Sequence, residues 1–124
     1  MNIRNLDTYV ANLWDWGFLN DCFGGTRIRV TDLDGLVERN GHFLFIEAKS
    51  NGKDIPLGQK LLFKALIASP QNQVLIIWGE PNKPQMAQFW GHEPFTADEE
   101  KIRDVVKRWF AYANNNRPAV AVSQ

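Results

Sequence analysis

Residues 32 to 49 read DLDGLVERNGHFLFIEAK and carry the strongest local signal in the chain. Two stretches rich in β-forming residues, Arg27 to Glu38 and His42 to Lys49, flank the dipeptide Asn40-Gly41. Asn-Gly favours a two-residue hairpin turn, because both turn positions need a positive φ angle. The sequence therefore predicts an antiparallel hairpin centred on this dipeptide.

The position of the turn also determines which side chains lie opposite one another. With a two-residue turn at 40–41, the numbers of directly opposed residues sum to 81, so Asp34 faces Glu47 and Asp32 faces Lys49. Opposed side chains share one face of a hairpin, with Cβ atoms about 4.5–5.5 Å apart. We therefore expect these four charged side chains together on one face. The other face is the expected core face and carries Leu33, Val37, Leu44 and Ile46.

Segments with helical spacing precede and follow the hairpin. Residues 5 to 16 place apolar side chains on one face and predict an amphipathic helix, which Gly17 ends. Pro56 suits the first turn of a second helix, and Pro70 stops that helix. The buried side of the second helix is predicted to hold Leu57, Leu61, Leu62, Ala65, Leu66 and Ala68.

The second half of the chain completes an α/β pattern. The continuous apolar run 74–78 predicts a buried central strand, and residues 86–90 predict a further short strand. Thr96 and Glu99 form a capping box that begins a helix running to about Tyr112. Helices and strands in this order predict an α/β fold, with a mixed sheet flanked by helices. The last helix is predicted to turn Ile102, Val105, Val106, Trp109 and Phe110 inward.

The composition is that of an ordinary globular chain. Of the 124 residues, 44% are hydrophobic and 23% are charged, and we predict one domain over residues 1–113 with a flexible tail over 114–124. The formal net charge of zero excludes a protein that coats nucleic acid or anionic membrane through bulk charge. The single cysteine, Cys22, excludes an internal disulfide framework and a Cys-rich zinc site. We expect no membrane span and no signal peptide, and hence a cytoplasmic location.

The expected pairing of Asp34 with Glu47 points to a metal site. Two carboxylates about 5 Å apart repel by roughly 3 kcal/mol at an effective dielectric constant near 20. A divalent cation explains why such a pair would be kept, because two carboxylates, water and a phosphate oxygen suit Mg²⁺. Such a metal polarises a phosphodiester and lowers the pKa of its bound water. Lys49, on the same face, would position the attacking water or stabilise charge on the phosphate.

An acid on one strand and an acid-x-lysine motif on its hairpin partner resemble the PD-(D/E)XK nuclease superfamily. Here the residues are Asp34 and Glu47-Ala48-Lys49. The resemblance covers roughly residues 5 to 79, where the order of elements resembles the αβββαβ core of the restriction-endonuclease-like fold; the C-terminal helix is extra. The phrases DLDG, IEAK and PLGQ between residues 31 and 59 resemble small phage-type, RecB-like or resolvase-like members.

The resemblance implies a role for each matching residue. Asp34 and Glu47 would bind Mg²⁺, with Mn²⁺ as a substitute, and the backbone carbonyl of Ala48 would complete the protein ligands. Lys49 would be catalytic, and Gln59 resembles an auxiliary glutamine that some branches place at the start of the next helix. The implied activity is hydrolysis of phosphodiester bonds in DNA, with a branched, nicked or single-stranded substrate as the first expectation.

The chain departs from the family pattern in three places. Leu33, not proline, precedes Asp34, and no glutamate occurs before Glu38, although many members carry one on the first helix. Asp7 and Asp15 are the acids within the predicted first helix. Asp7 is the better substitute for the missing glutamate, because it borders the apolar face of that helix and Asp15 lies on the opposite side. Residues 18–31 leave little room for the first strand of the family core.

Several alternatives remain open from the sequence alone. Asp32 is a second metal ligand, the salt-bridge partner of Lys49 or an ordinary surface acid. A cluster that follows the site, Lys53, Lys60 and Lys64, either meets phosphates or forms a solvated helix face. The whole chain is alternatively a catalytically silent nuclease-fold protein that binds nucleic acid or acts as an anti-defence interaction protein. Finally, the choice of DNA over RNA, and a homodimer or larger complex, are open.

Overall fold

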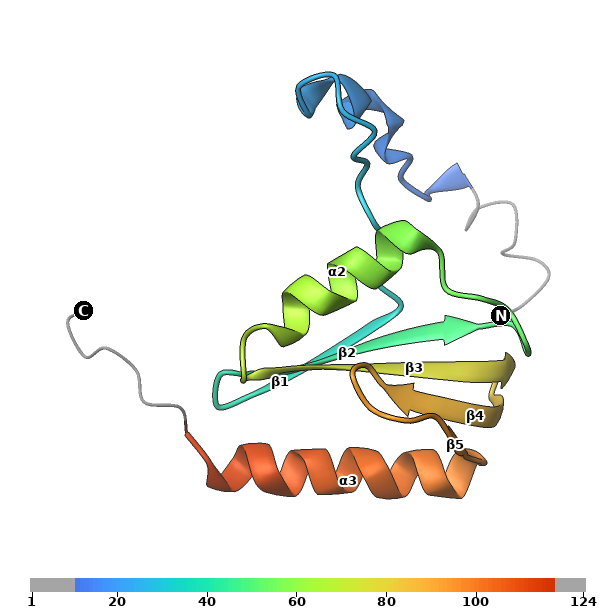
Figure 1. Ribbon diagram of the computed structural model, residues 1–124, viewed down its shortest axis with the longest axis vertical. Coiled ribbons are helices and arrows are strands. Elements are labelled where there is room, and N and C mark those ends of the chain that lie inside the picture. Colours follow the sequence, from blue (N-terminus) through green and yellow to red (C-terminus); the bar gives the residue numbers. More distant parts are fainter. Residues whose placement is uncertain (1–10, 118–124) are drawn as a thin grey trace. The chain divides into compact units, whose positions relative to one another are not determined.

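The computed structural model describes residues 11–117 and has an α/β architecture (Figure 1). The chain divides into two compact units, Met1–Asp32 and Leu33–Gln124. The first unit contains the 3-10 helix η2 (Trp16–Cys22). The elements of the second unit are, in chain order, β1 (Gly35–Arg39), β2 (His42–Lys49), α2 (Leu57–Ile67), β3 (Asn72–Glu80), β4 (Lys83–Phe89), β5 (Phe95–Thr96) and α3 (Glu99–Asn115).

The five strands form one mixed sheet in the order β1-β2-β3-β4-β5. β2 and β3 are parallel and are connected through α2, whereas the other neighbouring strands are antiparallel. This arrangement confirms the predicted α/β class with a mixed sheet. No helix of the described residues is long and apolar enough to cross a membrane.

The β1–β2 hairpin has the predicted register. Its paired residues run from Gly35 opposite Ile46 to Arg39 opposite His42, so each pair sums to 81. Asn40 and Gly41 form the turn with φ angles of 52° and 80°. The positive φ at both positions explains why this dipeptide is suited to the turn.

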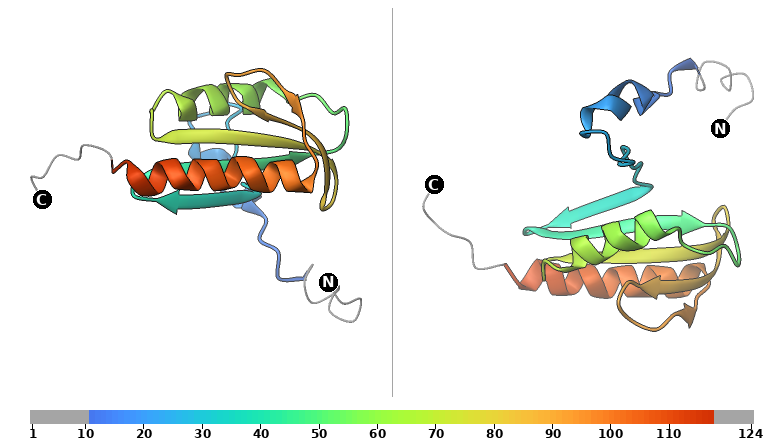
Figure 2. Two further views of the ribbon diagram at one scale, coloured as in Figure 1. Left: turned by 90° about the horizontal axis from the view of Figure 1, so that it is seen from below. Right: turned by 45° about the horizontal axis from the view of Figure 1, so that its top comes forward.

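The sheet is buried on both faces, with α3 over one face and α2 over the other (Figures 1 and 2). Side chains of a strand alternate between faces. Leu44 and Leu75 therefore pack with Val105 and Trp109 of α3. Val74, Ile76 and Phe45 pack on the other face with Phe63 of α2. Burial on both faces accounts for the continuous apolar run of β3.

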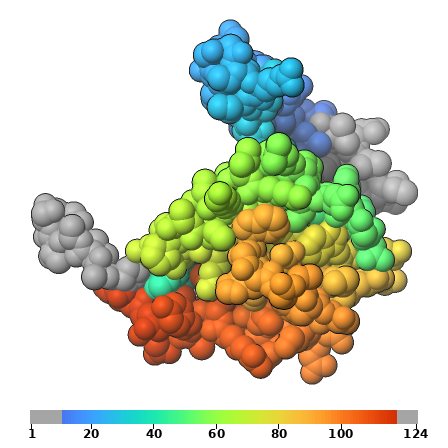
Figure 3. Space-filling view, in the orientation of Figure 1, coloured from blue at the N-terminus to red at the C-terminus, as the bar shows by residue number. Residues whose placement is uncertain are grey.

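The segment that follows β4 extends the core on the α2 side. Trp90 packs edge-to-face against Phe63, with ring centroids 5.7 Å apart. Figure 3 shows this segment (orange) against α2 (green). A Cβ atom at Gly91 would lie 3.2 Å from Cδ1 of Ile67, so the chain passes close to the helix there. α2 is thereby held from its side as well as from the sheet below it.

The secondary structure predicted for the first unit is mostly wrong where the structure describes it: Ala11 is helical as predicted, but the helix does not continue to residue 16. Residues 1–10, including Asp7 and the first half of the predicted helix over 5 to 16, lie outside the described residues. Within the described part, residues 13–15 have no regular structure and η2 follows. The predicted strand from Arg27 is also wrong, because the described chain forms no strand before Gly35.

Several side chains predicted to be buried are exposed. Leu57 is 71% exposed and Leu61 is 59% exposed, because Phe63 and the residues one turn from it, not these leucines, pack on the sheet. Phe110 of α3 is 47% exposed, whereas its neighbour Trp109 is buried in the core as predicted. On β1, an edge strand, Val37 is exposed, and Leu33 lies before the strand and is exposed too.

The start and end of α3 also differ from the prediction. Asp98 is the N-cap residue, and its side chain accepts a hydrogen bond from the backbone N–H of Lys101 at 2.8 Å. Thr96, the predicted cap, belongs to β5 instead. The helix continues to Asn115, so the first residues assigned to the tail are helical.

Candidate functional site

The candidate site lies in the second unit, at the end of the β1–β2 hairpin away from its turn. Asp34 directly precedes β1, and Glu47, Ala48 and Lys49 are the last residues of β2. Gln59 lies in the first turn of α2, the helix that follows β2 after a loop. The fold thus brings together five residues that the sequence analysis selected.

Asp34 is held by the backbone of the opposite strand. Its Oδ2 accepts a hydrogen bond from the N–H of Ala48 at 2.8 Å. The ladder between the two strands begins only at Gly35, so this side chain replaces the next rung of backbone hydrogen bonds. The Asp34 carboxyl also interacts with the Glu47 carboxyl, whose pKa it raises.

Glu47 is the buried acid of the site. It is 8% exposed, and its Oε1 lies 3.9 Å from Nζ of Lys49. Burial raises the pKa of the Glu47 carboxyl, and the nearby charge of Asp34 raises it further, whereas Lys49 and the hydrogen bond from Gln59 act in the opposite direction. The surroundings of Glu47 therefore favour its neutral carboxyl form, whereas a bound cation would favour the ionised carboxylate.

Gln59 leaves one polar atom without a partner. Its Nε2 donates to Oε1 of Glu47 at 3.5 Å. Its Oε1 is buried and finds no hydrogen-bond partner among the described residues. If the Gln59 amide were flipped, its oxygen would face the Glu47 carboxylate and the two acceptors would repel each other. The observed orientation of the amide is therefore the favourable one. A buried acceptor of this kind is expected to bind water or a ligand.

The available oxygen atoms fit a hard cation such as Mg²⁺. Among residues 11–117, no group of three His, Cys, Asp or Glu side chains is placed to hold a metal ion. A cation here would therefore be held by the carboxylates of Asp34 and Glu47, one backbone oxygen and waters. Because N–H and C=O of one strand residue point to the same neighbouring strand, the Ala48 carbonyl is directed to the side of Asp34 and would be the backbone oxygen available to such a cation.

Asp32 does not join this group in the predicted way. The hairpin ladder stops at Gly35, so the predicted pairing of Asp32 with Lys49 is absent. Asp32 instead accepts a hydrogen bond at 3.2 Å from the indole Nε1 of Trp16, within the first unit. Lys49 pairs with Glu47.

The three lysines that follow the site are all exposed. Lys53 lies in the loop between β2 and α2, and its carbonyl accepts a hydrogen bond from Nε1 of Trp78 at 2.8 Å. Lys60 and Lys64 lie four residues apart on α2 and hence on one side of it. Each is free to point into solvent or toward a phosphate backbone.

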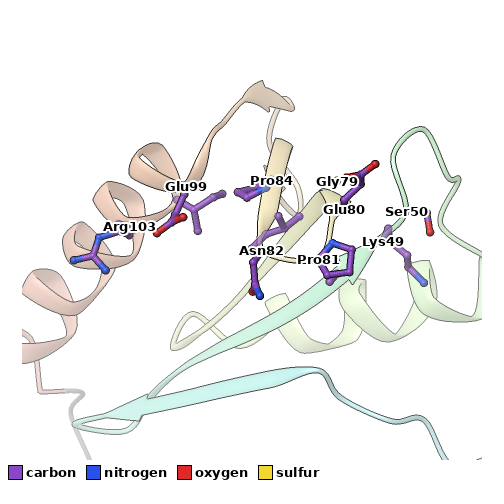
Figure 4. A pocket seen from close by; sticks show the side chains of 12 residues that line it. Lys49, Ser50, Gly79, Glu80, Pro81, Asn82, Pro84, Glu99 and Arg103 are labelled. Atoms are coloured by element: carbon purple, nitrogen blue, oxygen red, sulfur yellow. The ribbon is translucent and has the colours of Figure 1, made fainter. Parts of the chain in front are cut away.

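A cavity of about 680 Å³, which the sequence analysis missed, lies at the carboxyl ends of the parallel strands (Figure 4). It is bordered by the end of β2, by the β3–β4 turn and by the first turns of α3. The turn consists of Pro81 and Asn82 between the paired residues Glu80 and Lys83. Proline followed by asparagine is a recognisable turn signal, and it would have predicted a hairpin between the two strands expected at 74–78 and 86–90.

Comparison with known proteins assigns no family to the chain. No protein-family model, no curated protein and no solved structure matches it. The geometry of the Asp34–Glu47 group and the resemblance of its motif are therefore the indications of function that the chain offers.

Proposed function

We propose that the chain is a metal-dependent nuclease that hydrolyses phosphodiester bonds of DNA, with a restriction-endonuclease-like fold. The observation that carries this proposal is the buried carboxylate of Glu47, which lies beside a second acid and 3.9 Å from the ammonium of Lys49. The order β1-β2-α2-β3 supports the fold, because it agrees with the ββαβ part of the family core.

The donor set favours Mg²⁺, with Mn²⁺ as a substitute. Asp34, Glu47 and the carbonyl of Ala48 would hold the ion, and Ala48 also fixes the Asp34 carboxylate through its N–H. When bound, the ion polarises the phosphodiester and lowers the pKa of a coordinated water. Its charge also offsets the repulsion between the two carboxylates.

Lys49 and Gln59 would act on the reacting groups. The side chain of Lys49 is mostly buried, at 12% exposure, and a charge there would interact strongly with developing charge on a phosphate. The unpartnered Oε1 of Gln59 would accept a hydrogen bond from the attacking water and orient it. The two side chains approach the same Glu47 oxygen, Oε1.

The lysines Lys53, Lys60 and Lys64 would contact the phosphates that flank the cleaved bond. They lie in the loop and helix that follow Glu47, and they are exposed. With a neutral chain overall, binding of the substrate would depend on this local basic surface and on the metal.

The experiment that tests the proposal is a cleavage assay with end-labelled branched, nicked, single-stranded and duplex DNA, and with matched RNA. The protein is assayed with Mg²⁺, with Mn²⁺ and with chelator. We expect cleavage of at least one substrate with either metal, and none with chelator.

Two variants give the assay its control. Glu47→Ala removes the buried ligand and should abolish cleavage, whereas Lys107→Ala changes an exposed lysine of α3 and should leave it intact. Tight DNA binding without cleavage under any metal would instead favour a catalytically silent binding protein.

A further inference from the structure

We propose that the cavity at the carboxyl ends of β2 and β3 binds one unpaired nucleobase of the substrate strand, next to the nucleotide whose phosphate occupies the Asp34–Glu47 site. The link to a cleaved strand rests on the proposed function. Binding of a base depends only on the cavity itself.

The size and position of the cavity fit this role. Its volume of about 680 Å³ lies within the range of small-molecule sites. Glu47 faces α2, and Ala48, the next residue of the strand, lines the cavity on the α3 side. Lys49 lines the cavity too, and its ammonium lies 3.9 Å from the Glu47 carboxylate. A nucleic-acid strand that passes around the end of β2 would therefore reach the Asp34–Glu47 group and the cavity with neighbouring nucleotides.

The walls suit the flat face of a base. Ile77 of β3 and Ile102 of α3 give the cavity apolar lining. Pro81 and Pro84 of the β3–β4 hairpin add two rigid rings to it. Such apolar lining suits the flat face of a base, because burying that face removes apolar surface from water without requiring a hydrogen bond.

The hairpin wall is fixed in shape before a ligand arrives. Proline holds its own φ angle near −65°, and Asn82 after it has a φ of 61°. A Cβ atom at Gly79 would lie 2.3 Å from the carbonyl oxygen of Lys83, so only glycine allows the strands to approach this closely. A pre-formed wall lowers the ordering cost of binding.

Polar groups at the rim supply recognition of the base edge. Figure 4 shows Glu99 and Arg103 on α3 across from Asn82 of the turn. Within residues 11–117, neither the Glu99 carboxylate nor the Arg103 guanidinium has an ion-pair partner within 4.0 Å. A carboxylate accepts hydrogen bonds from an exocyclic amino group, which adenine, guanine and cytosine carry and thymine lacks. The cavity should therefore prefer the three amino-bearing bases.

The test uses free nucleosides, which carry no phosphodiester bond and need no metal. Deoxyadenosine, deoxyguanosine, deoxycytidine and thymidine are titrated into the ¹⁵N-labelled protein in chelator. We expect shifts of the backbone amides of Ile102 and Asn82, with thymidine binding weakest. Glu99→Gln should reduce the preference over thymidine, and Asn82→Gly, which keeps the positive φ, should weaken binding about 2-fold to 10-fold. Lys107→Ala, on α3 but outside the cavity, should bind as the wild type does.

The outcomes separate this inference from the proposed nuclease activity. Absence of nucleoside-induced shifts at the cavity, or equal binding of all four nucleosides in wild type and Glu99→Gln, overturns the base site even if the protein cuts DNA. Base binding with the expected preference, in a protein that never cuts, supports the cavity and removes the nuclease proposal.

Discussion

The N–H of Ala48 donates a hydrogen bond to Oδ2 of Asp34 at 2.8 Å, across the open end of the β1–β2 hairpin. The acid that precedes one strand is thereby fastened to the strand that carries Glu47 and Lys49. This single contact positions the first acid of the candidate site without an extra rung of the sheet.

The contact predicts a difference between two substitutions at Asp34. In Asp34→Asn the side-chain oxygen still accepts from Ala48, whereas Asp34→Ala leaves that N–H without its partner. A hydrogen bond to a charged group contributes about 1.5–3 kcal/mol. We expect Asp34→Ala to be less stable than Asp34→Asn by about 1–2 kcal/mol in urea unfolding with chelator present. Equal stabilities of the two variants would contradict the contact.

The raised pKa of the Glu47 carboxyl predicts how stability changes with pH. The folded state holds this proton more tightly than the unfolded state, so stability falls as pH rises from the ordinary value of 4.5 through the raised folded pKa. Glu47→Gln has no such proton and should be the more stable protein above that window, in chelator. Thermal unfolding from pH 4 to 8 measures the difference. Glu93 is exposed, so the control variant Glu93→Gln should keep the wild-type dependence of stability on pH. If the curve of Glu47→Gln also ran parallel to the wild-type curve, the result would contradict a raised pKa at Glu47.

The exposed lysines of α2 predict a change in the salt dependence of DNA binding. Each lysine that meets a phosphate contributes about 0.7–0.9 to the slope of log K against log salt concentration. Lys60→Ala with Lys64→Ala should lower that slope by about 1.4–1.8, with Ca²⁺ replacing Mg²⁺ so that the DNA is not cut. Lys107→Ala on α3 should leave the slope unchanged. A double variant with the wild-type slope would show that these lysines form only a solvated helix face.

The start of α3 predicts opposite outcomes for two neighbouring polar residues. Asp98 caps the helix by accepting from the N–H of Lys101, so Asp98→Ala should lower the free energy of unfolding by about 1 kcal/mol. Thr96 lies in β5 and is exposed, so Thr96→Ala should change it by less than about 0.5 kcal/mol. Urea unfolding of both variants shows which residue caps the helix. A larger loss of unfolding free energy in Thr96→Ala than in Asp98→Ala would favour the cap expected from the sequence.

The hairpin and the site were predictable because both depend on local rules. Asn40-Gly41 fixes a two-residue turn, and the turn then fixes every pairing up to Gly35 and Ile46. Asp34 lies one residue beyond the last pair, so its place near Glu47 followed from the same count. The extra information in the structure is that a side chain, not the backbone, closes that end.

The helix faces were less predictable because hydrophobicity does not say which side meets the sheet. α2 offers apolar side chains around much of its circumference. The sheet receives Phe63 and Leu66, while Leu57 and Leu61 are left exposed. The choice depends on the parallel crossover from β2 to β3, which is a long-range feature of the fold.

The cavity was unpredictable for a related reason. Its lining comes from β2, the β3–β4 turn and α3, which are distant in sequence. Only the turn residues Pro81 and Asn82 gave a local signal. The sequence marked Glu99 as part of a helix start, and nothing near it in the sequence indicated that it would line the same cavity as Lys49.

The most direct test of the central claim is single-turnover cleavage of the best DNA substrate, started by adding Mg²⁺ to the preformed complex. If Asp34 and Glu47 hold the catalytic ion and Lys49 acts beside it, the wild type cuts only after Mg²⁺ is added. Asp34→Asn and Lys49→Ala should each slow the reaction on the order of 10²-fold or more, while DNA binding is retained. Cleavage at the wild-type rate in either variant, or cleavage that persists in chelator, would contradict the account.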